Sequence, residues 1–100
     1  MSYFEDAFLP HVRLTILRLL ADAPGYSAND SVLVSATAAI GLPATRDQVR
    51  TQIGWLAEQG LVRAEHPTPT LTVAVITERG CDVAAGRGSV QGVQRPSPAP

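Results

Sequence analysis

The sequence predicts a mostly α-helical fold with one small β-hairpin, in the order helix, helix, helix, hairpin, helix. Three observations in the second half of the chain lead to this prediction. An amphipathic helical pattern over 45–59 ends at Gly60. Two short runs of β-type residues over 61–76 follow at once, and Thr77 with Glu78 then opens another helix. This order is typical of a winged helix-turn-helix, in which residues 45–59 would read DNA.

The first helix is predicted by apolar side chains that recur at helical spacing and continue to Ala23. They are Val12, Ile16, Leu19 and Leu20. Pro10 lacks a backbone N–H and would break a hydrogen bond deep inside a helix, so we expect the helix to begin or kink near that residue. Pro24 and Gly25 end it.

The second helix is predicted to begin at a capping box formed by Ser27 and Asp30. Its expected buried face consists of five apolar residues. They are Val32, Leu33, Ala36, Ala39 and Ile40. Gly41 followed by Pro43 stops the helix.

The third helix is predicted over 46–59, with Thr45 and Gln48 as its capping box and Gly60 at a position that needs a positive φ. Its core-facing stripe contains Val49, Ile53, Leu56 and Ala57. The opposite face, open to solvent or ligand, contains Asp47, Arg50, Thr51, Gly54 and Glu58. Trp55 lies off the stripe, and we expect it to pack against the first helix, the hairpin or a partner chain.

The hairpin is predicted from two short strands over 61–65 and 71–76, the second rich in Val, Ile and Thr. The loop over 66–70 contains two prolines, and strand pairing is expected to stop before Pro67 because proline has no backbone donor.

A short fourth helix is predicted over 78–85, capped by Thr77 and stopped by Gly86. Beyond it Gly, Ser, Gln and Pro dominate, and few apolar side chains remain for burial. The prediction is therefore a winged helix domain over 1–88 and a disordered, proline-rich tail over 89–100.

The composition fits one domain with a single core, since the chain has 100 residues of which 45% are hydrophobic. The formal net charge is -1, and all eight basic side chains are Arg. A protein that binds DNA by neutralising many phosphates is normally far more basic, so any such binding must come from local placement. No apolar run is long enough to span a bilayer, and we expect no membrane association and a location in the cytoplasm of a bacterial host.

Four segments of the chain resemble a family of small proteins from Mu-like phages and prophages that are often described as ArsR-like regulators. The segments cover 19–27, 46–51, 55–62 and 95–98. The resemblance extends over nearly the whole chain and implies a winged-helix fold, which by itself does not define an activity.

Metal binding and catalysis are not predicted. The metal-sensing ArsR proteins require sets of Cys, His or carboxylate ligands, whereas Cys81, His11 and His66 lie far apart in this sequence. The chain also has no glycine-rich phosphate loop and no signature of a nucleophile with its base. We therefore expect no metal, no cofactor and no enzymatic activity.

The predicted DNA contacts follow from placing the third helix in a major groove. Thr45 and Arg46 would then hold phosphate, and Arg50 and Thr51 would reach base edges. The full set of candidate DNA-binding residues is Thr45, Arg46, Gln48, Arg50, Thr51 and Arg63, the last being the nearest cation on the hairpin. Asp47 on the same helix face repels phosphate, and the hairpin tip over 66–70 has no Arg.

These observations support two functional hypotheses. The first is a phage or prophage transcriptional regulator that binds double-stranded DNA through 45–59 and the 61–76 hairpin, as a homodimer so that two weakly charged helices act together. The alternative is a non-enzymatic winged-helix adaptor that contacts a phage or host protein in phage assembly or host takeover, with the proline-rich tail as an extended ligand.

Overall fold

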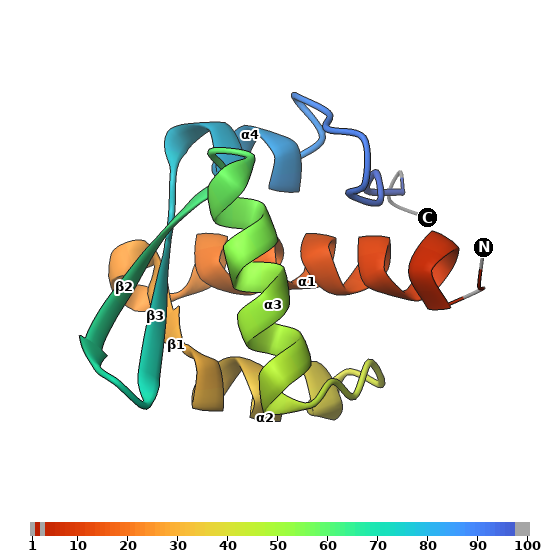
Figure 1. Cartoon of the computed structure of the whole chain (residues 1–100). Coiled ribbons are helices and arrows are strands. Elements are labelled where there is room, and N and C mark those ends of the chain that lie inside the picture. Colours follow the sequence, from red (N-terminus) through yellow and green to blue (C-terminus); the bar gives the residue numbers. More distant parts are fainter. Residues whose placement is uncertain (1, 3, 98–100) are drawn as a thin grey trace.

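The computed structural model describes residues 2 and 4–97 (Figure 1). In this part of the chain, four α-helices pack with a three-stranded antiparallel sheet. The elements are a π-helical turn Phe4–Phe8, α1 Leu9–Asp22, a 3-10 turn Pro24–Tyr26, β1 Ser27–Asn29, α2 Asp30–Ala39, α3 Arg46–Glu58, β2 Val62–Thr68, β3 Leu71–Ile76 and α4 Glu78–Ala84. The predicted helices and hairpin are confirmed, and the strand β1 is an addition that the sequence did not predict.

Helix α1 forms the centre of the molecule, and α3 crosses it (Figure 1). Helix α1 begins at Leu9, so Pro10 lies in the first helical turn, where a missing backbone N–H costs no hydrogen bond. This agrees with the predicted start near Pro10. The buried side chains of α1 are Val12, Leu14, Ile16, Leu17 and Leu20.

The predicted start of α2 was wrong, and of its predicted buried face only Leu33 is fully buried. Residues Ser27–Asn29 pair with β3, so the helix begins only at Asp30, and the Asn29 side chain accepts from the Val32 backbone N–H at 2.8 Å as its cap. Asp30 then points inward, and the residues one and two turns later share its buried face. These residues are Leu33 and Thr37. Of the predicted buried residues, Val32 and Ile40 are exposed by 53% and 57%.

Helix α3 is confirmed together with its predicted capping box. The Thr45 hydroxyl accepts from the Gln48 backbone N–H at 3.1 Å, and the Gln48 side chain accepts from the Thr45 N–H at 2.8 Å. Gly60 has a φ of 75°, as its place after the helix required. The predicted stripe contributes Val49, Ile53 and Leu56 to the core, and Gln52 is buried beside them.

The sheet has the order β1-β3-β2, with β3 paired on both sides. Regular pairing of β2 with β3 runs to Glu65 opposite Val73 and is interrupted before Thr68 pairs with Leu71. The interruption coincides with Pro67, in line with its missing donor, although β2 itself continues to Thr68.

The chain after α4 returns toward the N-terminal end of α1 (Figure 1). Val93 is buried in the core, and the Gln94 backbone N–H donates to the Pro10 carbonyl oxygen at 3.1 Å. This differs from the predicted disordered tail, because two valines, Val90 and Val93, supply enough apolar surface to hold the segment. The last three residues of the predicted tail, 98–100, lie outside the described residues.

Candidate nucleic-acid interface

The first turns of α3 bring two predicted DNA-binding residues against a buried carboxylate. Arg50 Nε donates to Asp30 Oδ2 at 2.6 Å, and Arg46 Nε donates to the same oxygen at 3.3 Å. The two arginines lie four residues apart and therefore project from the same face of α3. The Asp30 side chain is 0% exposed, so solvent takes no part in neutralising it.

The same two guanidinium groups reach the tip of the hairpin. The Thr70 carbonyl oxygen accepts from Arg46 Nη2 at 2.9 Å and also from Arg50 Nη2. We call Asp30, Arg46, Arg50 and the Thr70 carbonyl the Asp30 cluster. It joins the start of α2, the start of α3 and the turn between β2 and β3.

The Asp30 cluster is partly open to solvent on its arginine side. The side chains of Arg46 and Arg50 are 49% and 33% exposed, whereas the carboxylate beneath them is covered. Burial alone would raise the pKa of Asp30, but the hydrogen bonds and positive charges of Arg50 and Arg46 outweigh burial and lower it. Asp30 is therefore ionised at neutral pH, and two positive charges against one negative leave the cluster a single net positive charge.

The other predicted site residues do not join this cluster. Thr45 and Gln48 use their side chains to cap α3, and Thr51 is exposed. Arg63 pairs with Glu65 at 3.2 Å on the exposed side of β2. In the hairpin register Arg63 lies opposite Val75, which places it at the end of the hairpin remote from Thr70.

The surroundings of the Asp30 cluster are not strongly basic. Asp47 and Glu58 are both exposed on α3, at its two ends. The hairpin tip from His66 to Thr70 is exposed and contains no Arg. At the N-terminal end of α3, positive charge is thus concentrated in the outward parts of Arg46 and Arg50.

Two relatives share most of this chain. One is an uncharacterized protein, gp26, of Escherichia phage Mu, which is 49% identical over 94 residues that cover 94% of this chain and 96% of gp26. The other is an uncharacterized protein of Haemophilus influenzae strain KW20 Rd, 40% identical over 76 residues that cover 76% of this chain and 74% of the relative. The chain belongs to the family of phage Mu gp26. The predicted resemblance to Mu-like phage proteins is thereby confirmed for the gp26 family, while the winged-helix part of it stays a prediction.

No protein-family model matches this member of the gp26 family, and no solved structure matches it.

Sequence reasoning missed Asp30 as a member of the site and assigned it to a helix cap. One signal pointed to it: between 23 and 45 Asp30 is the only charged residue, and the next charge along the chain is Arg46. A lone carboxylate at the start of an apolar helix is expected to have a partner. The role of the Thr70 carbonyl, by contrast, depends on the hairpin bend and has no signal in the sequence.

Another arginine, Arg13 of α1, has a structural role beside Trp55. Its guanidinium carbon lies 3.9 Å from the centre of the Trp55 ring, and its Nε donates to the buried Gln52 side chain at 2.7 Å. Its Nη1 also donates to the Gly92 carbonyl oxygen at 2.9 Å. Of the three contacts predicted for Trp55, with the first helix, the hairpin or a partner chain, the structure shows the first.

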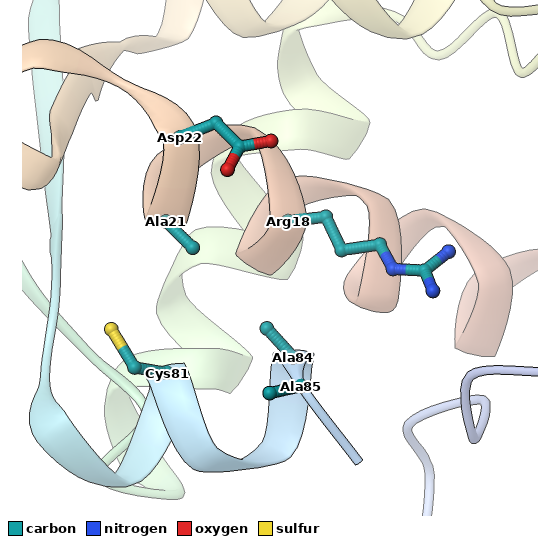
Figure 2. A pocket seen from close by; sticks show the side chains of 6 residues that line it. All are labelled: Arg18, Ala21, Asp22, Cys81, Ala84 and Ala85. Carbon is teal, nitrogen blue, oxygen red and sulfur yellow. The ribbon is translucent and has the colours of Figure 1, made fainter.

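A pocket lies between α1 and α4 (Figure 2). Its lining consists of Arg18, Ala21, Asp22, Cys81, Ala84 and Ala85. Figure 2 shows the Arg18 side chain extending along α1, away from Cys81. This lining has no His to act as a base toward the thiol, so the pocket has no nucleophile with its base.

Within residues 2 and 4–97, no three His, Cys, Asp or Glu side chains gather in a way that could hold a metal ion. None of the helices described there has the length and apolar character needed to cross a bilayer.

Proposed function

We propose that this member of the gp26 family is a winged-helix protein that binds double-stranded DNA and regulates transcription. In this proposal α3 enters the major groove and the β2–β3 hairpin is the wing. The succession of α2, α3 and the hairpin supports the winged-helix assignment.

The Asp30 cluster carries the proposal. Arginines that reach phosphate lose side-chain entropy on binding unless they are already ordered. Arg46 and Arg50 are held by the Asp30 carboxylate and by the Thr70 carbonyl, while a third to a half of each side chain stays exposed. Two ordered guanidinium groups next to the hairpin tip suit a DNA backbone that passes between α3 and the wing.

A homodimer would strengthen such binding. A single domain with one net positive charge in its Asp30 cluster makes few ionic contacts, and a second copy on a neighbouring half-site would double them. Light scattering at tens of micromolar tests this part of the proposal, and a monomer at that concentration would contradict it.

The test of DNA binding is a salt titration of the affinity for a mixed-sequence duplex. We expect the logarithm of the binding constant to fall linearly with the logarithm of the salt concentration. Arg50→Ala should weaken binding, whereas Arg87→Ala should leave it close to wild type. Arg87 is the matched control because it pairs with Asp82 at 3.2 Å on the α4 side and loses the same charge. Absence of binding at low salt, or equal losses in both variants, would refute the proposal.

A second candidate function is an adaptor that contacts a phage or host protein in phage assembly or host takeover. The observation that favours it is the exposed surface formed by α2 and its C-terminal end, where Val32 of the helix and Ile40 just after it are exposed by 53% and 57%. The stretch 31–45 around them has no charged residue, which suits an apolar partner.

Replacing Val32 and Ile40 by Ser tests the adaptor hypothesis. We expect the double variant to lose a partner that the wild type retains from an extract of phage-infected cells, and to bind duplex DNA unchanged. Equal recovery of that partner by both proteins would exclude this face of α2 as the contact surface.

A further inference from the structure

The two arginines of the Asp30 cluster do not provide two free charges. Asp30 is 0% exposed and accepts hydrogen bonds from both Nε atoms, at 2.6 and 3.3 Å, so no solvent ion replaces the arginines as its partner. The Ser31 backbone N–H also donates to the carboxylate, at 2.9 Å. One of the two arginine charges is therefore permanently committed to Asp30.

We propose that Asp30 is a positioning residue that limits the Asp30 cluster to the neutralisation of one DNA phosphate. The inference rests on the proposed function and specifies how the two arginines serve it. Asp30 orients both guanidinium groups through their inner edges and removes one of their two charges from the interaction with DNA.

The distribution of hydrogen bonds supports this role. In Arg46 and Arg50 the Nε atoms donate to Asp30 and the Nη2 atoms donate to the Thr70 carbonyl, and Arg46 Nη2 also donates to Asp30 Oδ1 at 3.4 Å. The Nη1 group of each arginine makes no hydrogen bond to the described residues, and these groups are the donors left for a ligand. A phosphodiester carries one negative charge, so a single phosphate across the two Nη1 groups neutralises the cluster.

Asp30 differs from the carboxylates of the other surface ion pairs because it is buried. Arg63 with Glu65 and Arg87 with Asp82 are one-to-one pairs in which both side chains are about half exposed or more. Such pairs are weak and separate readily in favour of a phosphate. The Asp30 carboxylate has no exposed position to move to, so its charge continues to act on any ligand of the arginines.

The experiment compares the salt dependence of duplex binding in wild type and Asp30→Asn. One additional neutralised phosphate steepens the slope of log binding constant against log salt by about 0.9. We expect this steepening in Asp30→Asn, together with tighter binding at low salt. Between 50 and 200 mM salt, the affinity advantage of the variant over wild type should shrink by about 3.5-fold.

A compensating variant separates the charge of Asp30 from its structural role. Asp30→Asn combined with Arg46→Gln has the net cluster charge of the wild type, so its slope should return to the wild-type value. If Asp30→Asn alone fails to fold, Arg46→Gln alone and the double variant carry the same comparison. The addition of Asp30→Asn to Arg46→Gln should again steepen the slope by about 0.9.

The outcomes distinguish this inference from the proposed function. If the salt slope is the same with Asp30 as with Asn at this position, in the wild-type or the Arg46→Gln background, while duplex binding persists, the inference is overturned. DNA binding then still stands. Absence of duplex binding by every variant at low salt overturns both. Steepening by Asp30→Asn that Arg46→Gln reverses supports both.

Discussion

Asp30 lies at a position where a charged side chain costs folding free energy unless its partners are well placed. An ion pair taken out of water often only balances its desolvation penalty, whereas a buried charge without a partner is strongly destabilising. Here two arginines and one backbone N–H surround the carboxylate, so its hydrogen-bonding capacity is well used. The arginines keep part of their hydration because a third to a half of each side chain is exposed.

The lowered pKa of Asp30 predicts how stability depends on pH. A carboxyl group whose pKa is lower in the folded state stabilises the fold fully above its unfolded value of about 3.9. This stabilisation is lost as the pH falls through the folded-state pKa. Asp30→Asn should therefore lower the free energy of unfolding by about 2 kcal/mol at pH 7, and the difference from wild type should shrink below about pH 4.

Urea denaturation followed by Trp55 fluorescence, repeated from pH 7 to pH 2.5, measures this difference. Asp82→Asn is the control, because Asp82 forms an exposed pair with Arg87 and should contribute almost nothing at any pH. A stability difference for Asp30→Asn that stayed constant over the whole range would contradict the assigned role of the ionised carboxylate.

Single residues were predicted from the sequence where their role depends on near neighbours. Thr45, Gln48 and Gly60 follow local rules for the ends of a helix, and all three behave as predicted. Asp30 depends on Arg50, which lies 20 residues away, so its pairing was beyond any local pattern. Arg46 and Arg50 were therefore predicted as neighbours one turn apart on the third helix, but without the carboxylate that holds them.

At the scale of elements, the C-terminal segment packs closely against Trp55 of α3 at one glycine. Gly92 has a φ of 100°, and a Cβ there would lie 2.8 Å from Trp55 Cζ2. Because real Cβ atoms essentially never approach so closely, only glycine fits without movement of the indole ring or the chain.

Gly92→Ala should accordingly cost about 2 to 4 kcal/mol, from the strained backbone and from overpacking against Trp55. Gly41→Ala is the matched control, since Gly41 also has a positive φ, of 84°, but has no neighbour within 4 Å of the added Cβ. It should cost only about 1 to 2 kcal/mol. Thermal unfolding measures both variants, and Trp55 fluorescence should change in Gly92→Ala alone. Equal costs would show that the segment does not press on Trp55.

Elements were predicted well where periodicity and caps agree, as in α3, and less well where a tertiary contact decides. Strand β1 has only three residues and exists because β3 lies beside it, so its own sequence carries no strand signal. That strand delays the start of α2, and the helix then buries Asp30, Leu33 and Thr37. One long-range pairing thus explains the wrong start of the second helix.

At the scale of the whole molecule, the core extends beyond the predicted domain boundary at residue 88. Val93 is buried with the side chains of the core, and the backbone of the next residue bonds to Pro10. The composition of residues 89–100 is typical of a disordered segment. Two valines of this segment, three residues apart, nevertheless pack with the core. The fold was therefore predicted in its order of elements and not in its extent.

A chain that ends at residue 88 should be less stable than the full chain by at least about 2 kcal/mol, because it lacks the burial of Val93. A chain that ends at residue 97 is the control and should unfold at the same urea concentration as the full chain. Equal urea midpoints for all three chains would show that the segment after α4 contributes nothing to the fold.

In the proposed complex, Arg46 and Arg50, held by Asp30, are the side chains that contact DNA. The most direct measurement is an NMR titration with a mixed-sequence duplex at low salt that follows the side-chain Nε–Hε signals of the arginines. We predict that the signals of Arg46 and Arg50 shift with added duplex while that of Arg87 stays in place. Duplex-dependent shifts elsewhere in the protein, with the Arg46 and Arg50 signals unmoved, would contradict the claim.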